Sequence, residues 1–176
     1  MIARYTGKEM GAIWTDRRRY ETWLAVELAA TDALAASGVV PFEDAKALRE
    51  RADFDIARIE DIEQVTQHDV IAFTTAVAEK VGPAARWLHF GLTSSDVLDT
   101  ALAVQLVQAT DLILRDIDAL LVAVRRRAEE HRDTPMIGRT HGVHAEPMTF
   151  GVKLALWYAA IERGRARVAR AREIVA

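Results

Sequence analysis

The segment from Ser95 to Thr134 contains neither glycine nor proline, and this uninterrupted run limits the fold more than any other feature of the sequence. Its apolar side chains recur at helical spacing and form one continuous stripe, made of Leu98, Leu102, Ala109, Leu112, Ile113, Ile117, Leu120 and Val124. At ~1.5 Å per residue the helix would be roughly 55–60 Å long. It would also contain far more residues than the average of about 11–12 for a helix in a globular protein. A helix of this length needs long partners, so the segment predicts a helical bundle.

A second apolar stripe lies near the end of the chain, at Leu154, Trp157, Tyr158, Ile161 and Val168. We expect a helix that starts at Pro147, because proline is favoured in the first turn, and that continues to the last residue. Two long helices do not enclose a core by themselves. The stripes therefore predict a bundle completed by helices beyond these residues, an obligate oligomer, or both.

Shorter helical patterns precede the long ones. Thr6 and Glu9 have the spacing of a capping box at the start of a first short helix. Further helices, separated by glycine, proline and polar residues, are expected at residues 16–37, 42–52, 56–64 and 67–82. We find no convincing strand pattern, so the predicted fold class is all-α. The composition changes near Thr93, which predicts a domain of short helices at 1–93 and the start of the long bundle at 94–176.

The composition argues against several kinds of function. The chain has no cysteine, which rules out disulfides, thiolate metal sites and a cysteine nucleophile within it. A formal net charge of −3 gives no general attraction to nucleic acid or to an anionic membrane. No apolar run approaches the ~20 residues that span a bilayer, and the first residues lack the apolar core of a secretory signal. We therefore expect a cytoplasmic protein with no nucleic-acid or membrane partner.

Five arginines lie close together in the last predicted helix: Arg163, Arg165, Arg167, Arg170 and Arg172. A basic run of this kind could bind nucleic acid. These arginines, however, cover several sides of a helix, and no aromatic side chains are interleaved with them. We expect a solvated or inter-subunit face instead.

Polar side chains gather at the expected ends of helices. Four of the five histidines, His68, His89, His141 and His144, lie there beside Asp, Ser, Thr or Gly. Histidine titrates near neutral pH and can act as a general acid or base, although any one of them could simply cap a helix. The cluster at residues 93–96 opens the long helix with hydroxyls and free N–H groups. It suits a carboxylate or phosphate, but taken alone it favours an ordinary N-cap.

The segment from Gly138 to Pro147 joins the two long helices and holds two glycines, two histidines, an arginine and a carboxylate. Glycine permits close approach of a ligand to the backbone, and Arg139 could hold a carboxylate or brace the loop. His141, His144 and Glu146 lack the spacing of a helical zinc motif, so we expect no metal site.

Three segments of this sequence, in this order and spacing, resemble the adenylosuccinate lyases: Gln67-His68-Asp69-Val70, His89-Phe90-Gly91-Leu92-Thr93-Ser94-Ser95-Asp96-Val97 and Gly138-Arg139-Thr140-His141-Gly142-Val143-His144-Ala145-Glu146-Pro147. The opening Arg4-Tyr5 and the later Ile13-Trp14-Thr15-Asp16 are also similar to that family, so the resemblance covers essentially the whole chain. Related lyases of the fumarase and aspartase superfamily share the elimination chemistry but differ after the Gly-x-Thr-His element.

The resemblance implies a β-elimination that splits a C–N bond in purine nucleotide biosynthesis. Fumarate would leave adenylosuccinate to give AMP, and would leave the succinylated aminoimidazole carboxamide ribotide (SAICAR) to give the carboxamide (AICAR). Because removal of a proton beside a carboxylate builds negative charge, such a site needs donors for the dianion and an acid for the leaving nitrogen. The resemblance implies no cofactor and no metal, and a homotetramer whose active sites are shared between subunits.

The same resemblance assigns roles to individual residues. His141 would protonate the leaving nitrogen, and His68 would assist at the substrate. Substrate-binding positions are Arg4, Tyr5, Gln67, His68, Asp69, Thr93 and Ser94, with His89 as a further contact. His144 and Glu146 would brace the loop.

Two features depart from that family. Gln67 stands where relatives more often have a basic residue, which affects phosphate affinity or selectivity. The family's base is a serine on a mobile loop later in the chain, and these residues contain no such loop. We therefore expect an N-terminal part that is inactive alone. Two alternatives remain, another lyase of the same superfamily and a helical scaffold that uses its bundle only for assembly.

Overall fold

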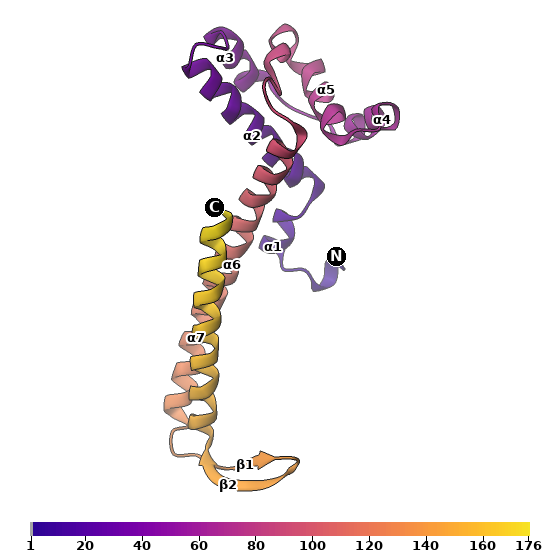
Figure 1. Ribbon diagram of the computed structural model, residues 1–176. Helices are drawn as coiled ribbons and strands as arrows, with labels where there is room; N and C mark the ends of the chain where they lie inside the picture. Colours follow the sequence, from indigo (N-terminus) through magenta and orange to yellow (C-terminus); the bar gives the residue numbers. More distant parts are fainter. Residues whose placement is uncertain (1) are drawn as a thin grey trace. The chain divides into compact units, whose positions relative to one another are not determined.

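The computed structural model describes residues 2–176 and divides the chain into two compact units, Met1–Gln105 and Leu106–Ala176 (Figure 1). Within the described residues there are seven α-helices and one two-stranded sheet. The long helix α6, Ser94–Glu130, contributes to both units. The all-α fold class is confirmed, with a small hairpin that the sequence analysis did not expect.

The first unit holds the short helices, which follow one another as η1 (Ala3–Tyr5), α1 (Lys8–Ile13), α2 (Asp16–Ala36), α3 (Phe42–Arg51), α4 (Ile56–Thr66), α5 (Asp69–Val81) and η2 (Pro83–Trp87). The predicted bounds of α2 to α5 are confirmed to within two residues. The predicted capping box is wrong, because Gly7 is the N-cap of α1 and no side chain caps this helix. Instead, the Thr6 hydroxyl donates to the carbonyl of Ile2 at 3.0 Å.

An aromatic cluster forms the centre of the first unit. Tyr20 stacks on Phe73 with ring centroids 5.7 Å apart, and Trp23 meets Phe73 edge to face at 5.5 Å. Aromatic pairs of this geometry add about 0.5–1.5 kcal/mol beyond the burial of their surface. Val97 and Ala101 of α6 are fully buried in the same core. The first turns of the long helix are therefore fixed by the first unit.

This packing explains why the unit boundary at Gln105 falls inside α6. The sequence pattern marks only where the long helix starts, near Thr93. The unit boundary depends instead on what this helix packs against, and its first turns pack in the core of the first unit. The division into domains at 1–93 and 94–176 stays a prediction.

The second unit contains the rest of α6, the strands β1 (Pro135–Thr140) and β2 (Val143–Thr149), and the helix α7 (Phe150–Val175). The long helix was expected to reach Thr134 but ends at Glu130, four residues before Thr134-Pro135. Pro147 was expected to open the last helix, yet it lies in β2 opposite Ile137. Thr149 is the N-cap of α7, and its hydroxyl accepts from the N–H of Val152 at 3.3 Å.

The helix α7 runs back antiparallel to α6 within the second unit (Figure 1). Two ion pairs join them, Arg165 with Asp118 and Arg172 with Asp111, and both partners are spaced by seven residues. The guanidinium hydrogen bonds lower the pKa of both aspartates. Both ion pairs are exposed, so the expectation of a solvated or inter-subunit face for these arginines stays a prediction.

Apolar side chains of the second unit remain exposed along both helices. Exposed large side chains there include Ile113, Leu120, Val122, Leu156 and Trp157. Within the described residues, α6 is also the one helix long and apolar enough to cross a membrane, with a mean hydropathy of 1.5 over an 18-residue window. The expectation that no apolar stretch is long enough to span a bilayer is therefore wrong for α6 by length and composition. A core helix of a bundle passes the same test, so the absence of a membrane partner stays a prediction.

Candidate functional site

Three residues other than glycine have a left-handed backbone in the part of the chain that the structure describes: Gln67 at φ 50°, His89 at 62° and His141 at 50°. Residues other than glycine rarely adopt this backbone conformation, and such backbone strain is concentrated at functional sites. All three residues are among the predicted site residues. The left-handed backbone therefore marks residues that the sequence motifs also predict to belong to the site.

His68 and Ser94 are brought together although they are far apart in the sequence. His68 is the N-cap of α5, where its Nδ1 accepts from the N–H of Ile71 at 3.3 Å. Its Nε2 lies 3.4 Å from Oγ of Ser94, the first residue of α6. Because Nδ1 accepts, the proton of the neutral ring is on Nε2 and points at the Ser94 hydroxyl. The starts of two helices thus meet at a histidine and a serine.

Two neighbours of His68 are held by local hydrogen bonds. Asp69 accepts from the N–H of Val70 at 2.7 Å, and its Oδ1 lies 3.5 Å from Nδ1 of His68. Gln67 turns its side chain back on α4, where its amide donates to the carbonyl of Gln64 at 2.9 Å. The amide thus satisfies a free carbonyl at the end of that helix. A substrate-binding role for Gln67 and Asp69 stays a prediction.

An ion pair fixes the turn that carries these residues. Arg58 of α4 donates to both carboxylate oxygens of Glu79 on α5, at 3.0 and 2.7 Å. These hydrogen bonds lower the pKa of Glu79 below its ordinary value. Because the pair spans α4 and α5, it helps to hold the 67–68 turn between them.

The start of α6 is capped from within. The carboxylate of Asp96 accepts from the N–H of Thr93 at 2.8 Å, which is one half of a capping box. Thr93 is exposed and Ser94 is half-buried. The N-cap interpretation of this cluster is therefore correct, and the Ser94 hydroxyl still faces His68.

His89 is bound to a carboxylate, Glu27, that belongs to none of the sequence motifs. Glu27 of α2 is completely buried, and its Oε1 lies 2.6 Å from Nδ1 of His89. Its Oε2 accepts from the backbone N–H of His89 at 2.8 Å. A signal existed in the sequence, because Glu27 lies on the same helical face as Tyr20, Trp23 and Leu24. A carboxylate on an apolar face indicates a buried partner.

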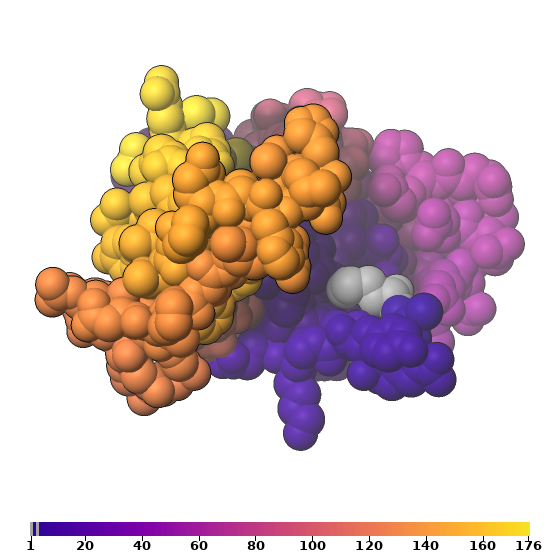
Figure 2. Space-filling view, turned by 90° about the horizontal axis from the view of Figure 1, so that it is seen from below, coloured from indigo at the N-terminus to yellow at the C-terminus, as the bar shows by residue number. Residues whose placement is uncertain are grey.

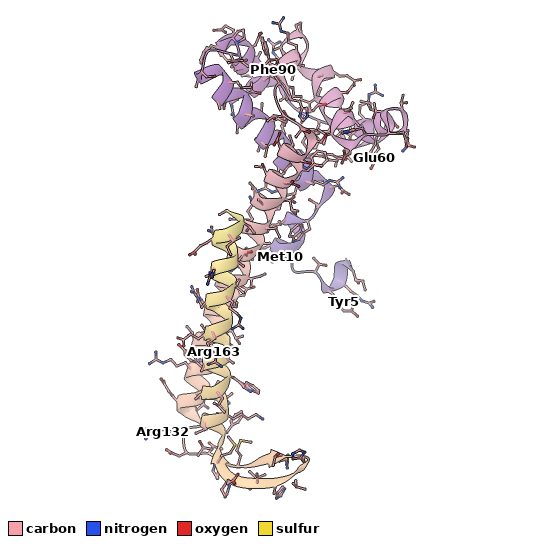
Figure 3. The ribbon with its side chains drawn as sticks, in the orientation of Figure 1. Tyr5, Met10, Glu60, Phe90, Arg132 and Arg163 are labelled. Atoms are coloured by element: carbon pink, nitrogen blue, oxygen red, sulfur yellow. The ribbon has the colours of Figure 1, made fainter. Side chains whose placement is uncertain are left out.

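Arg4 and Tyr5 lie in η1, where the guanidinium of Arg4 is 4.8 Å from the ring centroid of Tyr5. Tyr5 is 73% exposed, and Figure 3 shows it well apart from Phe90, the residue after His89. The structure does not bring these two residues together with His68 and Ser94. Their role in nucleotide binding stays a prediction.

His141 occupies the tip of the hairpin in the second unit. The strands pair Thr140 with Val143, so His141 and Gly142 form a two-residue loop in which both have positive φ. This is the type I′ turn that matches the twist of a hairpin. His141 is exposed, and in Figure 2 the hairpin, in orange, forms part of the molecular surface. The tip therefore presents an imidazole on a defined turn.

The remaining polar residues of the hairpin lie across its two strands. Arg139 pairs with His144 in the ladder, and both are exposed, as is Glu146. Within residues 2–176 no group of three histidine or acidic side chains is placed to hold a metal ion. No metal site is assigned, and the bracing role of His144 and Glu146 stays a prediction.

The described residues thus form a helical domain that carries a candidate site of histidines and hydroxyls at the ends of its helices. The chain belongs to the lyase family, because the model of that family matches residues 4–176.

The curated relatives include several adenylosuccinate lyases. The chain is 52% identical to the adenylosuccinate lyase of Bacillus subtilis (strain 168), over 98% of the chain and 40% of that protein. It is also 52% identical to the adenylosuccinate lyase of Synechocystis sp., over 100% of the chain and 41% of that protein. The chain thus spans about two fifths of the length of the relatives that it matches.

Solved structures show the same fold. A 3-carboxy-cis,cis-muconate lactonizing enzyme from Pseudomonas putida matches with a TM-score of 0.90 and 34% identity, over 98% of this chain and 41% of that chain. A fumarate lyase from Mesorhizobium sp. BNC1 matches with a TM-score of 0.87 and 32% identity, over 94% of this chain and 40% of that chain. The fold of this chain is therefore shared with proteins whose named activities differ from one another.

Proposed function

We propose that this chain is the N-terminal part of an adenylosuccinate lyase, which eliminates fumarate from adenylosuccinate to give AMP and from SAICAR to give AICAR. The observation that carries the proposal is the 52% identity to adenylosuccinate lyases over nearly the whole chain. The solved neighbours of other activity are less similar, at 32% and 34% identity.

The geometry supports this chemistry at the start of α6. The succinyl group carries two carboxylates, and negative charge grows on one of them as the adjacent proton leaves. Thr93 and Ser94 supply hydroxyls at the positive end of a long helix, a position that stabilises negative charge. Ser94 also lies beside His68, so the substrate end of this helix has both donors and a titratable ring.

The proposal assigns protonation of the leaving nitrogen to His141. A general acid of this kind contributes typically 10²–10⁴-fold to the rate. The type I′ turn holds the imidazole at the tip of an exposed hairpin, where it is accessible to a substrate. His68 would assist at the substrate.

The proposal also includes assembly as a cytoplasmic homotetramer with active sites shared between subunits. The exposed apolar stripes of α6 and α7 support it, because they need partners to be covered. Light scattering of the full-length polypeptide should give four times the mass of one chain. A stable monomer would contradict the assembly.

A substrate panel tests the proposed function. The full-length polypeptide that contains these residues is incubated with adenylosuccinate, SAICAR, argininosuccinate and malate, and fumarate release is measured. We expect turnover of the first two compounds alone. Turnover of argininosuccinate or malate instead would assign the chain to another lyase. Stable assembly without any turnover would favour the scaffold interpretation.

A further inference from the structure

The buried carboxylate of Glu27 is the strongest feature that the proposed reaction leaves unused. Glu27 is completely buried, and both of its oxygens bind one residue, His89. Burial of a carboxylate is costly unless hydrogen bonds replace the lost water. A simple core position at this point of α2 would be filled better by an apolar side chain, as at Trp23 and Leu24. The buried carboxylate therefore points to a purpose beyond packing.

The two hydrogen bonds fix both the backbone and the ring of His89. The bond from its N–H to Oε2 stabilises a left-handed backbone, which residues other than glycine adopt only uncommonly. The bond at Nδ1 orients the imidazole and, with an ionised carboxylate, keeps a proton on Nδ1. No described residue bonds to Nε2, and the side chain of His89 is 26% exposed. The ring thus leaves Nε2 for a ligand.

Building on the proposed function, we propose that Glu27 is a positioning residue that acts on the nucleotide substrate through His89. It holds His89 with Nδ1 protonated, so that Nε2 accepts a hydrogen bond or a proton from the substrate beside the start of α6. A carboxylate behind a histidine serves the same purpose in other sites, where it sets the tautomer and orientation of the ring. His89 is the residue that touches the substrate, and Glu27 acts only through it.

The substitution Glu27→Gln tests this assignment with little change in shape. The glutamine oxygen can still accept from the N–H of His89, but its amide would donate to Nδ1 and move the ring proton to Nε2. In the full-length polypeptide we expect KM for adenylosuccinate to rise about 10-fold, the lower end of the effect of removing a partner that orients a metal-binding histidine, with a smaller change in kcat. Thr31→Val is the matched control, because Thr31 is also buried in α2 and its hydroxyl donates to the backbone carbonyl of Glu27, not to its carboxylate.

A double-mutant cycle separates positioning from stability. Asparagine tolerates the left-handed backbone, so His89→Asn removes the ring while keeping the turn. If Glu27 acts through His89, Glu27→Gln should leave KM unchanged in the His89→Asn background. An equal rise in KM in both backgrounds would overturn the proposal, as would a rise of the same size in Thr31→Val.

The ring proton gives a readout that does not depend on activity. In nitrogen NMR of labelled histidine, with His89→Asn used for assignment, Nδ1 of His89 should carry a proton in the unchanged protein. The proton should move to Nε2 in Glu27→Gln. An unprotonated Nδ1 in the unchanged protein would overturn the proposal even if the variant fails to fold. If adenylosuccinate is not cleaved but the NMR result holds, the proposed function fails and the positioning of His89 stands.

Discussion

Replacement of Gly151 by alanine should loosen the contact between α7 and the end of α6. A Cβ at Gly151 would lie 2.7 Å from the carbonyl oxygen of Ala128 and 2.7 Å from Cα of Arg132. Both are backbone atoms, which cannot rotate away. Gly151 is the second residue of α7, so alanine gains at most ~1 kcal/mol over glycine there, whereas overpacking costs about 1–3 kcal/mol. Because backbone obstructs the new methyl group, the upper end applies and the net loss is about 2 kcal/mol.

Gly164→Ala is the matched control within the same helix. The nearest atom to a Cβ at Gly164 is the flexible end of Arg167, at 3.6 Å. This variant should gain roughly 0.5–1 kcal/mol, because only the helical preference of alanine changes. The two substitutions are chemically identical and should have opposite effects on the free energy of unfolding.

Urea unfolding followed by circular dichroism measures the difference. With a slope of about 2 kcal/mol per M, the midpoint of Gly151→Ala should fall by about 1 M. Hydrogen exchange should increase around residues 128–155 and stay unchanged in α2 to α5. A midpoint that rises for both variants would show that α7 does not pack against α6 as closely as the structure has it.

Two further predictions concern the first unit. Phe73 is fully buried against Tyr20 and Trp23, so Phe73→Ala should lower the free energy of unfolding by about 3–5 kcal/mol in urea titration; a loss below 1 kcal/mol would contradict the aromatic core. Arg58 lowers the pKa of Glu79 from its ordinary 4.5, so the pair stabilises the fold above this pH and the contribution is lost as pH falls through the lowered pKa. Glu79→Gln should therefore reduce the loss of stability below pH 4.5, and an unchanged acid response would refute this account.

The helices of the first unit were predictable because glycine, proline and capping residues mark their ends. Gly38 and Gly82 both have positive φ at such ends, as expected for glycine residues that terminate helices. Periodicity alone gave the apolar faces, because these helices bury one side in a common core. It could not give the short capping contacts at Thr6, since alternative hydrogen bonds of a hydroxyl differ little in energy.

The hairpin was missed for a physical reason. Its strands are largely exposed, so they lack the alternation of apolar and polar residues that identifies a half-buried strand. The turn uses His141-Gly142 rather than the more frequent Asn-Gly, although histidine also tolerates positive φ. The strain at His141 was visible only in three dimensions.

The site motifs were found, but their contacts were not. The resemblance placed His68, His89 and Ser94 among the site residues, and the structure shows that His68 meets Ser94. The partner of His89 is Glu27, 62 residues away, and local sequence patterns carry no information on such a distant contact. Apolar spacing does not single out Glu27, because Tyr20, Trp23 and Leu24 on the same helical face already satisfy the pattern.

Fumarate release from adenylosuccinate by two hairpin variants tests the central claim most directly. His141→Asn keeps the type I′ turn, which asparagine favours, but removes the acid, while His144→Ala alters an exposed histidine on the same hairpin. In the full-length polypeptide, the account predicts that His141→Asn lowers kcat by about 10²–10⁴-fold and that His144→Ala retains turnover. Unchanged kcat in His141→Asn, with the hairpin intact, would contradict it.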